Sequence, residues 1–257
     1  MPAIITLTTD FGKVYPAIMK GVMLRMNPDI ETIDITDSIP PGDIIQGAFV
    51  LQFASVYFPQ GTIHVAIVDP GVGGERRALV IKGERYTLIG PDNGLLMPAA
   101  RAQGSFDVYE IADLGFYTSN VSPVFHGRDV FAPAAAFRSM GREIPGLRQI
   151  KDPVDLYFEV PRLTEDMITG KVLFVDSFGN VVTNISRDVI MGLCHYGQSL
   201  DVNGVLVPLL RTYCETERRG LLALVGSHGM AEIACSGDSA AELMGLKSGD
   251  NISITPQ

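Results

Sequence analysis

The stretch Val68-Asp69-Pro70-Gly71-Val72-Gly73-Gly74-Glu75-Arg76-Arg77 joins two short runs of apolar, β-forming residues. The first run, residues 62–68, ends on Asp69, and the second begins directly after Arg77. Pro70 fixes its own φ angle, and the three glycines remove side chains from one rim of the turn. In open α/β sheets, ligands bind beyond the carboxyl ends of the strands. The stretch is compatible with a charged niche for a ligand and equally with an ordinary glycine-rich hairpin whose charges are solvated.

The sequence up to residue 150 alternates between strand-like and helix-like patterns. Asp43 and Asp129 each precede a helix-like pattern, at the position where a carboxylate caps a helix. The expected strands are residues 3–9, 31–36, 62–68, 78–82 and 87–89, and the expected helices are residues 16–26, 44–57 and 130–141. Strands that alternate with helices are typical of a sheet covered by helices. We therefore expect residues 1–150 to form an α/β domain with a mainly parallel sheet and flanking helices.

Between these elements, Gly90-Pro91-Asp92-Asn93-Gly94 contains the Gly-Pro and Asn-Gly pairs that turn geometry favours. We interpret Asp92 and Asn93 as parts of a plain turn. No helix or strand is assigned to residues 95–120, where the pattern is weak.

After residue 150 the pattern changes. Prolines recur with charged residues between them, which indicates a linker over residues 151–166. Short strand-like runs follow, and the one expected helix is residues 239–244, capped by Asp238. We therefore expect a smaller C-terminal domain over residues 167–257, with an antiparallel, β-barrel-like sheet.

The composition limits the class of protein. Of the 257 residues, 46% are hydrophobic and 19% are charged, which is typical of a folded chain. The net charge of −9, with no basic cluster beyond Arg218-Arg219, argues against a nucleic-acid partner. No apolar run approaches ~20 residues, so no membrane span is expected. The N-terminus lacks the basic start of a signal peptide, and we expect a cytoplasmic protein.

Several common sites are not indicated by the sequence. The three cysteines are widely spaced without a C-x-x-C pair, and no histidine pair has metal-ligand spacing, so no metal site is expected. Gly71-Val72-Gly73-Gly74 does not match G-x-G-x-x-G. Neither a Walker motif nor a G-x-S-x-G elbow occurs.

Two loops carry groups suited to chemistry. His126 lies just before an expected helix, with Arg128 and Asp129 within three residues of it. The turn Asp176-Ser177-Phe178-Gly179-Asn180 presents a carboxylate, an aromatic face and an amide, which are the groups that bind a nucleoside. The alternative for this turn is an Asx-type bond with Phe178 in the core, and the spacing alone favours that alternative.

Seven short motifs occur in one order along the chain. They are Thr9-Asp10-Phe11-Gly12, Val68-Asp69-Pro70-Gly71-Val72-Gly73 followed by Arg76, Gly90-Pro91-Asp92-Asn93-Gly94, Phe125-His126-Gly127-Arg128-Asp129, Asp176-Ser177-Phe178-Gly179-Asn180, Gly226-Ser227-His228-Gly229 and Ala240-Ala241-Glu242-Leu243. Each motif alone is weak, but the ordered set resembles the S-adenosyl-L-methionine hydroxide adenosyltransferases, which are relatives of the fluorinase and the chlorinase. The resemblance runs from about Ile4 to Ile254.

This resemblance implies an enzyme that splits S-adenosyl-L-methionine into adenosine and L-methionine by attack of water or hydroxide on the ribose C5′. It implies that this nucleoside is the substrate, with no cofactor, and that the chain forms a homotrimer with active sites at subunit interfaces. The implied catalytic residues are Asp69, Arg76 and His126. The implied substrate-binding residues are Asp10, Phe11, Phe125, Asp176, Phe178, Asn180, Tyr213, Ser227 and His228.

The resemblance also assigns a part of the substrate to most binding positions. The roles are ribose binding for Asp10, the C5′ pocket for Phe125, adenine binding for Phe178, Asn180 and Tyr213, and the methionine end for Asp176 and Ser227. The halogenases carry a tyrosine where Asp69 stands, which favours the hydrolase. His228 stands where the fluorinase has an arginine, so carboxylate recognition is expected to rest on the backbone and Ser227. Val14-Tyr15 replaces an acid-containing turn of the family.

Two other functions remain open at this point. One is transfer of halide to C5′, for which Gly127 leaves room but which Asp69 opposes by charge repulsion. The other is a non-catalytic protein that binds S-adenosyl-L-methionine or adenosine, which would use the same binding residues but would not need the Asp69, Arg76 and His126 set.

Overall fold

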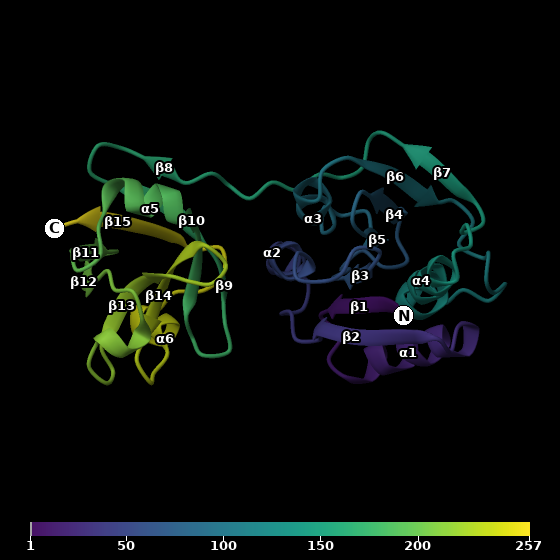
Figure 1. Cartoon of the computed structure of the whole chain (residues 1–257), viewed down its shortest axis with the longest axis horizontal. Helices are drawn as coiled ribbons and strands as arrows, with labels where there is room; N and C mark the ends of the chain where they lie inside the picture. Colours follow the sequence, from purple (N-terminus) through teal and green to yellow (C-terminus); the bar gives the residue numbers. More distant parts are fainter. Residues whose placement is uncertain (1) are drawn as a thin grey trace. The chain divides into compact units, whose positions relative to one another are not determined.

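The computed structural model describes residues 2–257 and divides them into two compact units (Figure 1). The first unit ends at Tyr157 and the second begins at Phe158. This division lies within the segment that the sequence predicts to be a linker. The segment before the division is held by contacts within the first unit. Arg77 donates a hydrogen bond to Asp152, and Arg101 donates one to Asp155.

A seven-stranded mixed sheet forms the centre of the first unit, in the order β2-β1-β3-β5-β4-β6-β7. The strands are β1 (Ala3–Thr9), β2 (Ile30–Thr36), β3 (Ile63–Ile67), β4 (Ala78–Gly83), β5 (Thr87–Pro91), β6 (Phe106–Ile111) and β7 (Leu147–Ile150). β2, β1, β3 and β5 are parallel, whereas β5-β4-β6-β7 are joined by antiparallel pairings. The short connection from β4 to β5 forces them to run antiparallel, because parallel neighbours need a long crossover. The expected α/β class is confirmed, with the parallel strands confined to one side of the sheet.

The helices of this unit are α1 (Val14–Met26), α2 (Ile44–Ser55), α3 (Met97–Ala102), a π-helical turn η1 (Gly127–Phe131) and α4 (Ala132–Ser139). α1 packs against α4, and α2 packs against α3 (Figure 1). Side chains of β1 alternate between the two faces of the sheet. Ile5 and Leu7 belong to the core that includes Met19 and Phe131, whereas Thr6 contacts His64. α3 and β6 lie in the segment for which the sequence predicted no element.

The two expected carboxylate caps have different outcomes. Asp43 caps α2 as predicted, since its Oδ1 accepts a hydrogen bond of 2.9 Å from the Gln46 amide. The prediction for Asp129 is wrong, because the helical segment begins earlier, with η1, and includes this residue. The Asp129 carboxylate instead accepts from the Ser122 amide at 2.8 Å and from the Arg128 guanidinium. It therefore ties the loop before the helix to the first helical turn.

An antiparallel sheet that is nearly closed on itself forms the second unit. The strands are β8 (Arg162–Leu163), β9 (Ile168–Val175), β10 (Val181–Ser186), β11 (Ser199–Val202), β12 (Val205–Pro208), β13 (Leu221–Val225), β14 (Met230–Cys235) and β15 (Asn251–Pro256). Their order is β12-β11-β15-β9-β10-β14-β13, with β8 paired to β9. A bridge between Leu209 and Ala223 brings the two ends of this order together. The expected barrel-like sheet is confirmed.

The helical segments of this unit are α5 (Arg187–Leu193), a short 3₁₀ turn η2 (Tyr213–Glu215) and α6 (Ala240–Met244). α6 was expected, but its cap is Ser239 and not Asp238, because the Ser239 hydroxyl accepts from the Glu242 amide. α5 was not expected, although Ser186 caps it in the usual way. Within residues 2–257, no helix has the length and apolar character needed to cross a membrane.

Candidate active site

An ion pair links the two ends of the glycine-rich loop that follows β3. Nε of Arg76 lies 3.0 Å from both carboxylate oxygens of Asp69, and Nη2 also contacts Oδ2. The side chains are only 3% exposed for Asp69 and 10% exposed for Arg76. A bidentate contact of this kind satisfies both charges while they are shielded from water. The Nη1 atom of Arg76 is buried and has no hydrogen-bond partner among the described residues.

His126 joins this pair from the loop before η1. Its Nδ1 atom lies 2.9 Å from Nη2 of Arg76. A guanidinium has only donors, so Nδ1 accepts and the ring carries its proton on Nε2. Burial, and then the neighbouring Arg76 charge, lower the pKa of His126 below its usual 6.5. The imidazole is therefore neutral near pH 7.

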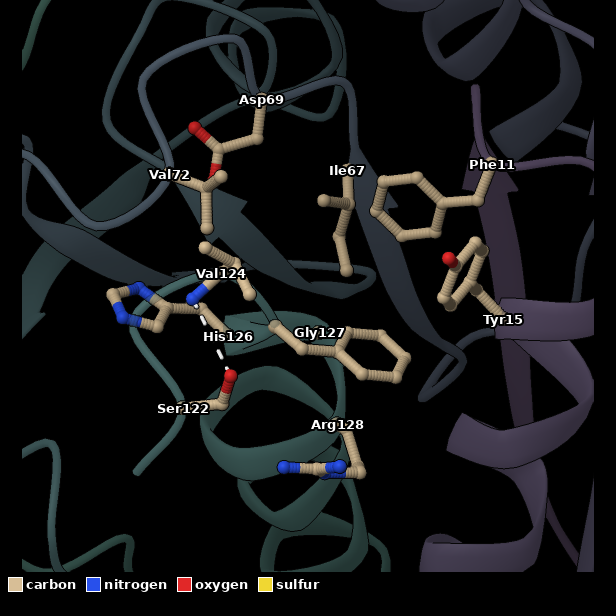
Figure 2. A pocket seen from close by; sticks show the side chains of 11 residues that line it. Phe11, Tyr15, Ile67, Asp69, Val72, Ser122, Val124, His126, Gly127 and Arg128 are labelled. Carbon is tan, nitrogen blue, oxygen red and sulfur yellow. Dashed lines mark hydrogen bonds between the residues drawn. The ribbon is translucent and has the colours of Figure 1, made fainter. Parts of the chain in front are cut away.

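A half-open cavity of about 450 Å³ lies beside these residues (Figure 2). Figure 2 shows Phe11 and Tyr15 on one side of it and Asp69 and Val72 on the other. The rings of Tyr15 and Phe125 meet edge to face, with centroids 5.2 Å apart. The cavity thus has mainly apolar walls, and the charged side chains of Asp69 and Arg128 also line it.

Gly73 fixes the contact between the two loops that carry the ionic residues. Its φ angle is +78°, and a Cβ atom at this position would lie 2.1 Å from the carbonyl oxygen of Pro123. Only glycine accommodates both conditions. The close approach therefore holds the Asp69 loop against the segment that leads to His126.

Asp10 follows β1 and is half-buried. One of its oxygens, Oδ2, accepts from the Gly42 amide at 2.8 Å. Within residues 2–257, its Oδ1 has no hydrogen-bond partner and is available to a ligand hydroxyl.

A second cavity, of about 630 Å³, lies in the C-terminal unit and is lined by Asp176, Phe178, Asn180 and Tyr213. The Asp176 carboxylate accepts from the backbone amides of Phe178 and Asn180 at 2.8 and 2.9 Å, and from Asn180 Nδ2 at 3.0 Å. The Asx-type turn is therefore present. Phe178 is 78% exposed, so the alternative of a core phenylalanine is wrong. Its ring is available for stacking.

Tyr213 and His228 meet at Glu232, a residue that the sequence reasoning did not identify. The Tyr213 hydroxyl donates to Oε1 of Glu232 at 2.6 Å, and His228 Nε2 lies 3.3 Å from Oε2. Nδ1 of His228 accepts from the Met230 amide. Burial and the neighbouring Glu232 carboxylate raise the pKa of Tyr213. The sequence signal for Glu232 is a single charged residue among the apolar residues of the segment that forms β14.

The residues expected to form the site fall into three groups. Phe11, Asp69, Phe125 and His126 line the first cavity, and Arg76 is bonded to Asp69 and His126. Asp176, Phe178, Asn180 and Tyr213 line the second cavity. Asp10, Ser227 and His228 line neither of these two cavities in the described part of the chain. Tyr15 and Val72 line the first cavity but were not among the expected residues.

The three cysteines do not form a metal site with one another or with other side chains in residues 2–257. Cys194 and Cys235 are buried, Cys214 is exposed, and all three are free thiols. Residues 2–257 contain no group of three or more His, Cys, Asp or Glu side chains placed to bind an ion.

Comparison with known proteins identifies the family of the chain. The family model described as the SAM hydroxide adenosyltransferase N-terminal domain matches residues 5–148, and that of the C-terminal domain matches residues 170–253. The chain belongs to the SAM hydroxide adenosyltransferase family, as the ordered motifs indicated.

Relatives resemble the chain over nearly its full length. A protein of Salinispora tropica named (R)-S-adenosyl-L-methionine hydrolase is 37% identical, with 98% of this chain and 97% of that protein covered. A protein of the same name from Thermus thermophilus is 36% identical, with 94% and 95% covered. The fluorinase of Nocardia brasiliensis is 27% identical over 98% of this chain and 96% of its own. The crystal structure of an uncharacterized conserved protein from Thermotoga maritima superposes with a TM-score of 0.90 at 33% identity, covering 98% of this chain and 99% of its own.

Proposed function

We propose that the protein hydrolyses S-adenosyl-L-methionine to adenosine and L-methionine. A water oxygen attacks the ribose C5′, the C5′–O bond forms, and the C5′–S bond breaks. The electron pair of that bond stays on sulfur, which leaves as the neutral thioether of methionine, and the water loses a proton. The observation that carries this proposal is the buried Asp69, Arg76 and His126 set beside an apolar cavity, in a chain of this family.

Arg76 is the group that we assign to the nucleophile. The leaving group needs no acid, so the difficulty lies in making water nucleophilic at neutral pH. A guanidinium stays charged and stabilises a developing hydroxide. Its buried Nη1 atom has no partner among residues 2–257, so its N–H groups are unused within the described structure and can donate to that oxygen. Asp69 holds the guanidinium in place through two bonds of 3.0 Å.

His126 orients the water and does not take its proton. Its Nδ1 is engaged by Arg76, so the nitrogen that remains, Nε2, carries a proton and can only donate. Proton acceptance therefore falls to Asp69 or to solvent. General base help is typically worth ~10²–10⁴-fold. Holding a nucleophile in line is worth ~7–11 kcal/mol, so positioning is the larger contribution.

The binding residues divide by chemistry. Asp10 offers a free carboxylate oxygen to the ribose hydroxyls. Phe178 and Tyr213 offer ring faces to adenine, and Asn180 lies beside them. Asp176 acts mainly through the turn that it closes. His228 is turned toward Glu232, which supports carboxylate recognition by Ser227 and the backbone.

Two alternatives are less well supported. Halide transfer would place an anion beside Asp69, whose carboxylate repels it at short range. A protein that only binds the nucleoside would not need a buried ion pair with a histidine fixed against it.

Incubation of the purified protein with S-adenosyl-L-methionine, in chloride-containing and chloride-free buffers, tests the proposal. Adenosine and methionine in both buffers is the expected result. A 5′-chloro nucleoside formed only with chloride would identify a halogenase. Intact substrate after long incubation would identify a binding protein.

The homotrimer belongs to the same proposal. Each cavity offers only part of what the substrate needs, because the first contains Asp69 and His126 and the second contains Phe178, Asn180 and Tyr213. Light scattering should give a trimer. Co-expression of Asp69→Ala and Phe178→Ala subunits should restore part of the activity that each variant alone lacks, and an inactive mixture would contradict active sites shared between subunits.

A further inference from the structure

We propose that Asp92 and Asn93 are positioning residues that hold both ends of the loop carrying Asp69 and Arg76. This inference rests on the proposed function. Nδ2 of Asn93 donates to the carbonyl oxygen of Val68 at 2.8 Å, directly before Asp69. Oδ2 of Asp92 accepts from Nε of Arg77 at 2.7 Å, directly after Arg76. Two adjacent residues of one turn thus bond to the residues that flank the loop.

The sheet order explains this juxtaposition. The loop leaves the end of β3 and returns into β4, but β5 lies between these two strands. The loop must therefore pass over the end of β5, where residues 92–94 form their turn. Gly90 permits the fit, because a Cβ atom there would lie 2.2 Å from the carbonyl oxygen of Ala66 on β3. The turn therefore supports the loop through its contacts and does not only continue the chain after β5.

Asp92 and Arg77 belong to a larger network of hydrogen bonds. Asp92 is only 4% exposed, and its Oδ1 accepts from the Val154 amide at 2.7 Å. The Asp92 amide donates to the carbonyl oxygen of Arg77 at 3.0 Å. Arg77 also donates to Asp152 at 2.9 Å. A buried carboxylate with charged and backbone donors is held in one orientation. The loop end at Arg77 is therefore fixed to two other segments.

The proposed reaction depends on an accurately placed Arg76 side chain. Arg76 has to meet Asp69 and His126 simultaneously, at 3.0 and 2.9 Å. A shift of about 1 Å at a reacting group can cost about 10²-fold in rate. In the described part of the chain, Asp92 and Asn93 line neither cavity. Loss of their bonds should therefore lower kcat and leave nucleoside affinity unchanged.

Asn93 allows a selective test because its amide has two separate contacts. Oδ1 accepts from the Leu95 amide at 3.2 Å and supports the turn, while Nδ2 holds Val68. Asn93→Asp keeps the first contact, replaces the Nδ2 donor with a carboxylate oxygen and adds one negative charge. Asn93→Ala removes both.

The first unit also contains a matched control. Asn27 follows α1 at the end opposite Tyr15, and it has the same two kinds of contact. Its Oδ1 accepts from the Asp29 amide at 3.1 Å, and its Nδ2 donates to the Ser139 hydroxyl at 3.0 Å. Asn27→Asp makes the same chemical change away from the site.

The experiment measures kcat, KM and melting temperature for each variant, and the Kd for adenosine by calorimetry. We expect Asn93→Asp and Asn93→Ala to lower kcat by about 10–100-fold, with adenosine Kd within about twofold of wild type. Asn27→Asp should keep wild-type kcat. Asp92→Asn should also lower kcat, which tests the other end of the loop independently.

The outcomes separate the two proposals. An Asn93→Asp protein with wild-type kcat, or parallel losses of kcat and adenosine affinity, would overturn the positioning role while wild type still forms adenosine. A wild-type protein that forms no adenosine would overturn the proposed function, and the positioning role with it.

Discussion

Nη2 of Arg76 lies 2.9 Å from Nδ1 of His126, and this contact determines the tautomer of the imidazole. A guanidinium can only donate, so the ring nitrogen facing it has to accept. The other nitrogen, Nε2, then carries the proton. His126 is thereby set up as a hydrogen-bond donor toward the nucleophile and not as its base.

The first prediction follows from this tautomer. His126→Gln retains an acceptor and an amide donor, whereas His126→Ala retains neither. If the role of His126 is donation, the glutamine variant should be more active than the alanine variant. One hydrogen bond to a charged group is worth about 1.5–3 kcal/mol, or about 10–100-fold in rate. Equal losses of kcat in the two variants would indicate instead that the imidazole acts as a base.

The second prediction concerns pH. The pKa of His126 is lowered below 6.5, so the neutral form predominates at pH 7. Protonation places a hydrogen on Nδ1, which then opposes the Arg76 donor. Activity should therefore fall only as the pH drops below 6.5 toward the lowered pKa, and His126 should contribute no loss above it. A pH profile of kcat/KM checks this, and His126→Gln should lack the acidic decline.

Removal of the ion pair should affect turnover more than binding. Arg76→Ala removes the donor assigned to the water, and Asp69→Ala removes the carboxylate that holds this donor in place. Loss of one such donor typically costs about 10²–10³-fold in kcat. Arg76→Lys keeps the charge but loses the fork that reaches Asp69 and His126 together, so it should be nearly as impaired. Adenosine Kd, measured by calorimetry, should change little. A large rise in Kd with kcat preserved would contradict these roles.

The ring of Tyr213 should contribute to adenosine affinity. Base stacking on an aromatic side chain is worth about 1–3 kcal/mol, so Tyr213→Ala should weaken adenosine binding by about 5–100-fold. Tyr213→Phe keeps the ring and should bind nearly as well. Its cost is in stability, because the buried Glu232 loses the 2.6 Å hydroxyl contact. If both variants bind equally poorly, the hydroxyl and not the ring is what matters.

His64 should make the fold sensitive to acid. It is fully buried, its Nδ1 lies 2.7 Å from the Thr6 hydroxyl, and burial lowers its pKa to about 4. The unfolded state, with a pKa near 6.5, binds a proton more readily than the folded state. Stability should therefore fall as the pH decreases from 6.5 toward 4, by up to about 3 kcal/mol. Urea unfolding at several pH values measures this, and a His64→Gln protein with the same pH dependence would contradict it.

Much of the fold follows from local pattern. The strand Ala3–Thr9 and the Asp43 cap were predictable because alternation and capping involve neighbouring residues. α3 and β6 were not, because their short sequences carry weak patterns and depend on packing against α2 and β4. Asp129 shows the limit of a cap signal. Its carboxylate bonds to Ser122, seven residues earlier, so the helical segment begins at a different residue.

In the candidate site, too, contacts within one loop could be predicted and contacts between distant segments could not. Asp69 and Arg76 could be paired from one loop, whereas the contact of Arg76 with His126 spans fifty residues along the chain. The sequence indicated the turn at Asp92 and Asn93 but not its role, which depends on β5 lying between β3 and β4. The motifs placed His228 at a binding position of the family. Its contact with Glu232 on β14 could not be inferred from those motifs.

The amide of Asn93 also bears on how the protein ages. Asn93 precedes Gly94, and asparagine before glycine is the pair most prone to spontaneous loss of ammonia, one reason why asparagine counts as a thermolabile residue. The Gly94 amide nitrogen displaces ammonia to form a succinimide, which water opens to aspartate or isoaspartate, and both products carry a carboxylate in place of the amide donor. The bonds to Val68 and Leu95 hold the amide in place, so the reaction has to wait for the turn to open. Stored protein should therefore lose turnover while it still folds and still binds adenosine, and it should gain one negative charge as it does so.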